Sequence, residues 1–87
     1  MSFELFGRNE QGRTGKLSLP HGDMLTPFFM PIATKGAVKT LSSFDIERLA
    51  SPIVLSNTYH LWLRPGLELM KEVGGLHKFM DWHGNIL

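Results

Sequence analysis

Residues 52–61 constrain the fold of this 87-residue chain more than any other stretch. They begin with a continuous apolar, β-branched run at 53–55, which is typical of a strand buried on both faces. Five hydrogen-bonding side chains follow without a break at 56–60. Because α/β proteins keep their binding and catalytic groups at the carboxyl ends of buried strands, this change predicts a functional site directly after Leu55.

Two short runs near the amino end predict antiparallel strands. Residues 3–6 are apolar-rich, residues 16–19 alternate polar and apolar, and the polar, glycine-spaced segment between them is suited to a turn. A third strand is expected at about residues 28–32, inside a dense apolar run. Pro27 and Pro31 have no N–H to donate, so they mark strand ends or a sheet edge.

A helix is expected before the polar stretch and further helices after it. Ser42 or Ser43 is suited to cap a helix at about residues 44–50, which Pro52 ends. The apolar side of this helix is expected to be Phe44, Ile46 and Leu49. Pro65 is suited to the first turn of the next helix. The apolar stripe of that helix is Leu67, Leu69, Met70 and Val73, and Gly74 and Gly75 stop it.

The remaining elements predict an α/β fold. Residues 76–82 are expected to form a short helix, and residues 86–87 the start of another strand. Strands and helices then alternate, which favours a parallel sheet with helices outside it. We therefore expect antiparallel strands over residues 1–25 and two β/α units over residues 26–87. Because a parallel sheet needs both faces covered, the chain is expected to be a fragment of a larger domain.

Composition excludes several classes of function. The net charge is +1 and no basic block is present, so the chain has no electrostatic footprint for nucleic acid by itself. It has no cysteine, which excludes disulfides and thiolate metal sites and fits a cytosolic protein. No apolar run approaches the roughly 18 residues of a membrane span. The first residues lack the features of a signal peptide.

Several segments carry a resemblance to a known family. They are Thr-Pro-Phe-Phe-Met-Pro at 26–31, Val-Lys at 38–39, Leu-Ser-Asn-Thr-Tyr-His-Leu at 55–61, Leu-Arg-Pro-Gly at 63–66 and Gly-Gly-Leu-His-Lys-Phe-Met at 74–80. In this order they strongly resemble the amino-terminal part of the tRNA-guanine transglycosylase (queuine tRNA-ribosyltransferase) family. The one departure near the predicted site is Ser56, where glycine is usual in the family.

The resemblance implies a fold, an activity and partners. The fold is a (β/α)₈ TIM barrel preceded by a small antiparallel sheet, with a zinc subdomain near the carboxyl end. The implied enzyme is cytoplasmic and dimeric, and exchanges guanine at the tRNA wobble position for a 7-deazaguanine base, preQ1 or queuine. One aspartate attacks the ribose C1′ and a second moves protons. Both aspartates and the Cys₃His zinc ligands belong to segments beyond Leu87, so this chain is expected to be inactive alone and to bind no zinc.

The resemblance also assigns roles to residues of this chain. Asn57 and Thr58 are implied to hydrogen-bond the acid–base aspartate of the next strand, although both could instead cap local backbone. Ile32 and Leu55, with Asn57, are implied to line a pocket for the ribose of a neighbouring tRNA nucleotide, although ordinary barrel core explains the two apolar residues equally well. No residue of the chain is predicted to be a catalytic acid, base or nucleophile.

The dimer interface implied by the resemblance includes the segment at about residues 33–49. Lys39, Leu61 and Phe79 are its candidate contacts, although Phe79 could equally be a helix-to-core contact. Two other functions remain open from the sequence. The chain could be a non-catalytic interaction module that pairs with a full-length transglycosylase, or part of another (β/α)₈ enzyme that shares only the architecture.

Overall fold

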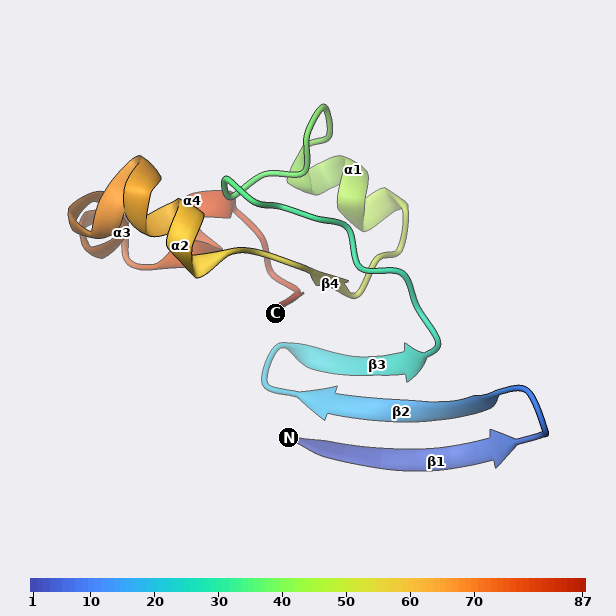
Figure 1. Cartoon of the computed structure of the whole chain (residues 1–87). Coiled ribbons are helices and arrows are strands. Elements are labelled where there is room, and N and C mark those ends of the chain that lie inside the picture. The colour runs from blue at the N-terminus through green and yellow to red at the C-terminus, as the bar shows by residue number, and fades with distance from the viewer.

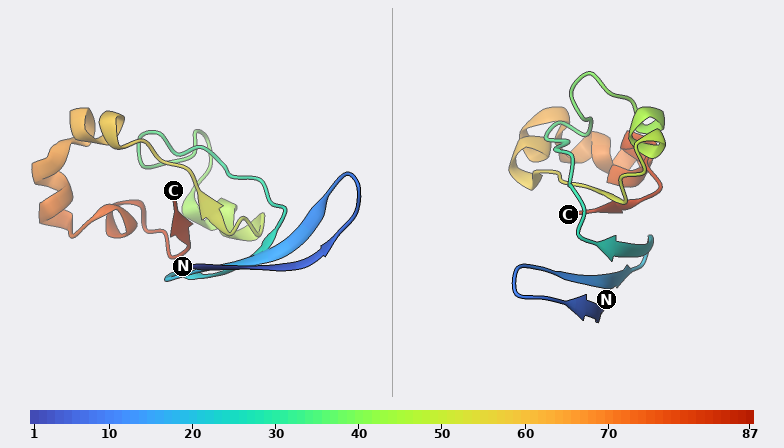
Figure 2. Two further views of the ribbon diagram at one scale, coloured as in Figure 1. Left: turned by 60° about the horizontal axis from the view of Figure 1, so that its bottom comes forward. Right: turned by 90° about the vertical axis from the view of Figure 1, so that its right-hand side faces the viewer.

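A computed structural model describes all 87 residues. The amino-terminal third is an antiparallel sheet of β1 (Ser2–Arg8), β2 (Arg13–Leu19) and β3 (Gly22–Thr26), in that order (Figure 1). The two predicted strands of this region are confirmed and are longer than expected. The Asn9 side chain accepts hydrogen bonds of 2.9 Å from the backbone N–H groups of Gln11 and Gly12, which closes the first turn. The β1–β2 hairpin projects away from the rest of the chain (Figure 2).

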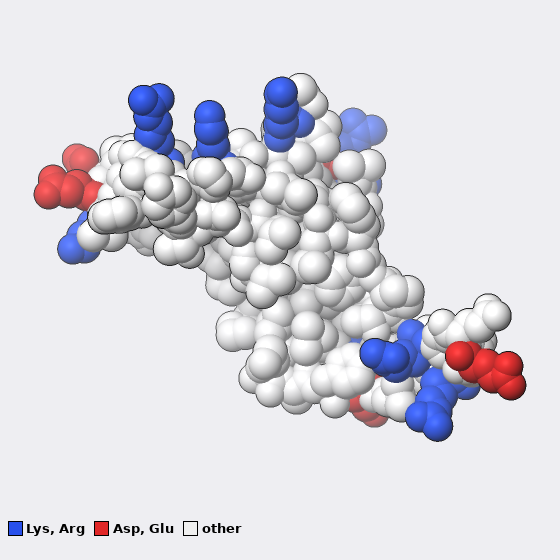
Figure 3. Space-filling view, viewed as in Figure 1, with Lys and Arg blue, Asp and Glu red and all other residues white.

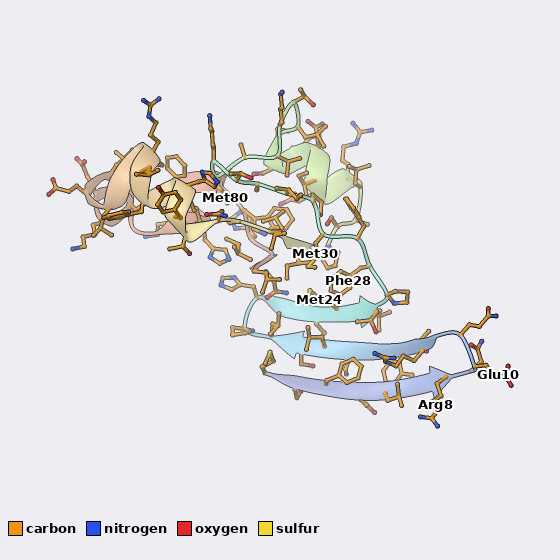
Figure 4. All side chains as sticks on the ribbon, in the orientation of Figure 1. Arg8, Glu10, Met24, Phe28, Met30 and Met80 are labelled. Carbon is orange, nitrogen blue, oxygen red and sulfur yellow. The ribbon has the colours of Figure 1, made fainter.

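The prediction of a strand at residues 28–32 is wrong. The third strand is β3, which ends at Thr26, and residues 28–31 form no strand. Proline explains the difference, because Pro27 and Pro31 have no N–H and a ladder cannot continue through them. A single parallel bridge joins Ile32 to Leu55 at the end of the segment. Figure 4 shows Phe28 and Met30 with Met24 in the layer between the antiparallel sheet and β4.

A second sheet is parallel, as the alternation of elements predicts. β4 (Ile53–Val54) pairs with β5 (Asn85–Ile86), and residues 31–33 lie along the other edge of β4. Both edges of the β4 segment are therefore hydrogen-bonded, through Leu55 N–H to Pro31 O (2.8 Å) on one side and Leu87 N–H to Val54 O (3.0 Å) on the other. This is an α/β arrangement with a small antiparallel sheet below it (Figure 2).

The helix before β4 is α1 (Ser43–Arg48), and its cap is the predicted Ser42. The Ser42 side chain accepts from the Asp45 N–H, and Asp45 accepts from the Ser42 N–H (2.9 Å) and hydroxyl (3.0 Å). The two hydrogen bonds that Asp45 accepts hold its pKa below the ordinary value of 3.8, and the bond from the Ser42 backbone N–H has the larger effect. The predicted apolar side is only partly right. Ile46 is buried, but Phe44 and Leu49 are 66% and 67% exposed.

The segment after β4 contains one more helix than predicted. α2 (Thr58–Leu61) begins inside the polar stretch and continues into a kinked segment, η1 (Trp62–Gly66). The backbone breaks at Arg64, which is extended (φ −151°), so Pro65 is not in the first turn of the next helix as predicted. α3 (Leu67–Val73) begins after it and α4 (Leu76–Met80) follows. The predicted stop is confirmed, because Gly74 adopts φ +96°, where a side chain would be strained.

The hydrophobic core lies between β4, α1 and the end of α4. Its fully buried members are Ala33, Ile46, Val54 and Trp82, and Val38, Met80 and Ile86 pack around them. The Trp82 indole N–H donates to the Asn85 carbonyl (3.0 Å), so the one buried polar atom of this side chain is satisfied. No helix of the structure combines the length and the apolar character that crossing a membrane requires.

Candidate functional site at the carboxyl edge of the parallel strands

Three parallel segments end side by side. The Ala33 N–H donates to the Leu55 carbonyl (2.6 Å), and the Ser56 N–H donates to the Leu87 carbonyl (2.8 Å). The Ser56 hydroxyl reaches across to the Ala33 carbonyl (3.3 Å). The ends of residues 31–33, 53–56 and 85–87 therefore form one edge, which we call the carboxyl edge. The sequence predicted a functional site directly after Leu55, and the structure places that position at this edge.

The two faces of this parallel sheet differ. Ala33, Val54 and Ile86 face the core formed with α1 and Trp82. Side chains alternate along a strand, so Ile32, Leu55 and Leu87 point to the opposite face. Leu55 is half-buried there, and Ile32 and Leu87 are 60% and 65% exposed. The face beside the carboxyl edge is therefore apolar and accessible, as a shallow wall against which a ligand could pack.

Asn57 is the N-cap of α2. Its Oδ1 accepts a hydrogen bond from the His60 N–H (3.1 Å), so the capping alternative considered from the sequence is confirmed. The cap uses only the oxygen. The Asn57 Nδ2 and the Thr58 hydroxyl make no hydrogen bond within the chain, and both side chains are exposed. The cap thus fixes the side-chain amide while leaving its donor available at the carboxyl edge.

Ser56 lies between the two apolar strand residues and the cap. Its hydroxyl donates to the Ala33 carbonyl, so it ties the loop after Ile32 to the end of β4. A glycine at this position would have no hydroxyl and could not make this bond. The carboxyl edge, from Leu55 to Thr58 with Ile32 and Leu87, carries no carboxylate. It can orient a reacting group, but it holds no acidic nucleophile or acid–base pair.

The three predicted interface residues lie in different settings. Lys39 is exposed in the loop before α1, whereas Leu61 is 8% exposed inside α2. Phe79 packs on the same loop. A Cβ on Gly36 would lie 2.7 Å from the Phe79 ring, so only glycine permits this close approach. Phe79 therefore makes the intrachain contact that was the alternative to an interface role, and its ring remains half-buried.

Charge is unevenly distributed over the surface. Figure 3 shows Lys and Arg side chains along the edge formed by α1, the loop before it and the α2–α3 segment, and both signs at the tip of the β1–β2 hairpin. The cations of residues 27–66 are Lys35, Lys39, Arg48 and Arg64, and the acids are Asp45 and Glu47. None of these cations forms an ion pair with a carboxylate. This edge therefore carries a net positive charge.

Zinc has no ligand set among these residues. The chain contains no cysteine, and nowhere do three or more His, Asp or Glu side chains come together. The Cys₃His set that the resemblance implies does not fit any part of this chain.

Sequence reasoning missed Asn85, to which it assigned no role. It is 4% exposed, and its side chain accepts from the His21 N–H (3.2 Å) and donates to the Gly22 carbonyl (3.1 Å). Its partners are 64 and 63 residues away in sequence, so no local pattern indicates them. Asn85 lies at the start of β5, at the opposite end of the parallel strands from Asn57.

A parallel α/β unit with hydrogen-bonding side chains at its carboxyl edge belongs to the class of proteins that bind ligands or perform catalysis at the ends of parallel strands. Known sequences identify the family within that class. Residues 8–87 match the family model described as "Queuine tRNA-ribosyltransferase". The chain belongs to the queuine tRNA-ribosyltransferase family.

Individual relatives agree with this assignment. The chain is 53% identical over its whole length to a queuine tRNA-ribosyltransferase of Methylobacillus flagellatus and covers 24% of it. It is 56% identical to one of Sorangium cellulosum, over 93% of this chain and 21% of the relative. A third, from Desulforamulus reducens, is 52% identical over 92% of this chain and 22% of the relative. The chain thus spans about a quarter of the length of these curated relatives.

Proposed function

We propose that this chain supplies the amino-terminal part of the catalytic barrel of a tRNA-guanine transglycosylase. The complete enzyme would exchange guanine at the tRNA wobble position for a 7-deazaguanine base, preQ1 or queuine. The observation that carries this proposal is the 53% identity over the whole chain to a relative named queuine tRNA-ribosyltransferase. The convergence of three parallel strand ends at the carboxyl edge supports it, because barrel enzymes assemble their sites there.

The reaction would pass through a covalent intermediate on residues outside this chain. One aspartate would attack the ribose C1′ as guanine leaves, and the incoming base would then displace the aspartate. A second aspartate, on the strand that continues β5, would handle the protons of the leaving and incoming bases. The carboxyl edge carries no carboxylate, which supports the proposal that these residues are inactive alone. The zinc site and the homodimer of the complete enzyme would likewise require further residues.

Asn57 and Thr58 would position the acid–base aspartate. β5 lies directly beside β4 through the hydrogen bond from Ser56 N–H to Leu87 O, so a residue shortly after Leu87 would be within reach of the free Nδ2 of Asn57. An amide N–H and a hydroxyl can hold a carboxylate without neutralising it. The accessible apolar wall of Ile32 and Leu55 would pack against the ribose of a neighbouring nucleotide of the tRNA.

A chimera tests this proposal. These 87 residues replace the matching residues of the Methylobacillus flagellatus relative, and guanine exchange into tRNA is measured. We expect an active chimera. Asn57→Asp keeps the oxygen that caps α2 but loses the Nδ2 donor, so kcat should fall about tenfold or more with little change in KM or stability. Asn9→Asp, which likewise keeps an acceptor in a turn, is the matched control and should leave kcat unchanged.

The outcomes separate the claims. A chimera that folds like the relative but exchanges no base would refute the proposed function. An active chimera in which Asn57→Asp keeps full kcat would refute only the role of Asn57.

One observation favours a second function, the interaction module. Phe44 of α1 and Leu49, which caps the end of α1, are largely exposed, and Lys39 lies in the loop before α1, so this surface has apolar area to bury in a partner. Phe79 is half-buried and would contribute the exposed part of its ring. Leu61 is 8% exposed and would contribute only if α2 moved. If the chain alone sediments as a complex with the full-length relative, and Phe44→Asp abolishes the complex, the module is favoured. If it does not associate, this function is excluded.

A further inference from the structure

The antiparallel sheet is attached to the rest of the chain by few polar contacts. Both hydrogen bonds that join residues 1–26 to residues 27–87 are made by the Asn85 side chain, one with His21 and one with Gly22. No backbone ladder and no ion pair crosses this junction. Met24 and Ile53 are buried there. The docking of the sheet therefore depends on a small apolar contact, the Asn85 side-chain amide and one further contact, between two aromatic rings.

The other contact at this junction is a pair of stacked histidine rings. His21 lies in the turn between β2 and β3, and His77 lies in α4. Their ring centroids are 3.8 Å apart and their planes differ by 11°. The His77 Nε2 lies 2.8 Å from the Gly84 carbonyl, so this nitrogen carries the hydrogen and Nδ1 is the position that accepts a further proton. The ring of His21 makes no hydrogen bond within the chain, so neither of its nitrogens is paired.

Nearby charges do not neutralise this pair. The charged and titratable groups on β2, β3, α4 and the residues beside them are Arg13, Lys16, Asp23, Lys78, Asp81 and His83. The neighbouring β1 adds the Met1 amino group, Glu4 and Arg8, and the neighbouring α3 adds Glu68, Lys71 and Glu72. Asp23 pairs with Lys16 at 3.9 Å, and Asp81 pairs with His83 at 3.9 Å. Neither carboxylate forms an ion pair with His21 or His77. Two imidazolium rings held face to face would therefore repel each other without a counter-charge.

We propose that the stack of His21 on His77 is a protonation-sensitive clasp between the antiparallel sheet and the parallel unit. The sheet stays docked while at least one ring is neutral. When both rings are protonated, the rings separate, the Asn85 hydrogen bonds break and the sheet undocks while the parallel unit stays folded. The contribution of the stack is present while at least one ring is neutral and is lost when both rings carry a proton.

The test uses nuclear Overhauser contacts between the ring protons at positions 21 and 77, measured on the 87-residue chain at about pH 7.5 and about pH 5. The hydrogen exchange of the Leu55 N–H, which donates to the Pro31 carbonyl, reports on the parallel unit in the same samples. In the unmodified chain, the ring contact should weaken at least about tenfold at the lower pH. Protection of the Leu55 N–H, corrected for intrinsic rates, should change by less than about twofold.

Two variants complete the test. His21→Phe keeps a flat ring for stacking but cannot be protonated, so its ring contact should persist at both pH values. His83→Phe changes an exposed histidine that is not a member of the stack, and should respond to pH as the unmodified chain does. The proposal is overturned if the contact persists in the unmodified chain at about pH 5 or is equally lost in His21→Phe. It is also overturned if Leu55 loses protection together with the contact, or if no contact exists at about pH 7.5.

Discussion

Replacing Asn85 with alanine should lower the free energy of unfolding by about 2 kcal/mol. The side chain makes two hydrogen bonds, of 3.2 Å and 3.1 Å, and a typical net contribution is about 1 kcal/mol each. Because Asn85 is 4% exposed, water does not readily replace its bonds to His21 and Gly22. A chain of this length has a total stability of roughly 4–13 kcal/mol, so the loss is a substantial part of it.

The matched comparison is Asn9→Ala. Asn9 also makes two side-chain hydrogen bonds to the backbone, but its partners Gln11 and Gly12 are exposed at the tip of a hairpin. Water can take over these bonds, so the loss should be no more than about 0.5 kcal/mol. The contrast between the two variants isolates burial, since the residue removed and the number of bonds are the same.

Urea unfolding followed by the fluorescence of Trp82 measures both variants. Trp62 is exposed, and Trp62→Phe in the background leaves the buried indole as the reporter. Trp82 donates to the Asn85 backbone carbonyl, which alanine retains, so the reporter keeps its hydrogen bond in the variant. A loss for Asn85→Ala that equals the loss for Asn9→Ala would refute the reasoning, because burial would then make no difference to the junction.

Two further predictions concern α1 and the turn after it. Ala50 has φ +56°, a left-handed conformation that costs a non-glycine residue roughly 1 kcal/mol, so Ala50→Gly should raise the urea midpoint or leave it unchanged, and a clear fall would contradict this. Asp45 has a pKa below 3.8 because Ser42 donates two hydrogen bonds to it. The contribution of ionised Asp45 to stability is fully present above about pH 3.8 and is lost as the pH falls through the lowered pKa of the folded state. Asp45→Asn should therefore reduce the acid sensitivity of unfolding below about pH 4, and an unchanged acid transition would contradict this.

The elements that were predicted correctly have local causes. A serine cap before α1 and a glycine after α3 act within one helical turn, so the sequence pattern contains everything that determines them. The run at 53–55 is apolar at consecutive positions because both of its faces are covered, and this also appears in the sequence directly. The polar residues that follow β4 were also predicted correctly, because the change from apolar to polar side chains is visible in consecutive residues.

The errors arise where two signals compete or where partners are distant. The run at 28–32 has the apolar composition of a strand, but two prolines remove the donors that a ladder needs. Asn57 was recognised as polar, and its capping of α2 was only one of two alternatives. The exposure of Phe44 and Leu49 depends on which elements cover α1, and helical spacing cannot specify this. The contacts of Asn85 depend on a chain reversal of more than sixty residues, which leaves no local trace.

Asn85 and Asn57 lie at opposite ends of the parallel strands and in opposite environments. The first is suited to stabilising the fold and the second to binding a ligand. Asn85 lies at the amino end, is buried, and satisfies both polar ends of its side chain within the chain. Asn57 lies at the carboxyl edge, is exposed, and uses its oxygen for the α2 cap while its amide nitrogen remains available. A buried side chain whose amide oxygen and nitrogen are both paired within the chain contributes to the fold. One that is held by half of its groups can present the other half to a ligand at little entropic cost, because its position is already fixed. This is the division expected of a barrel, in which the amino ends of the strands stabilise and the carboxyl ends bind. Under the proposed function, we therefore expect the substrate of the complete enzyme to lie beside Asn57 and away from the junction with the antiparallel sheet.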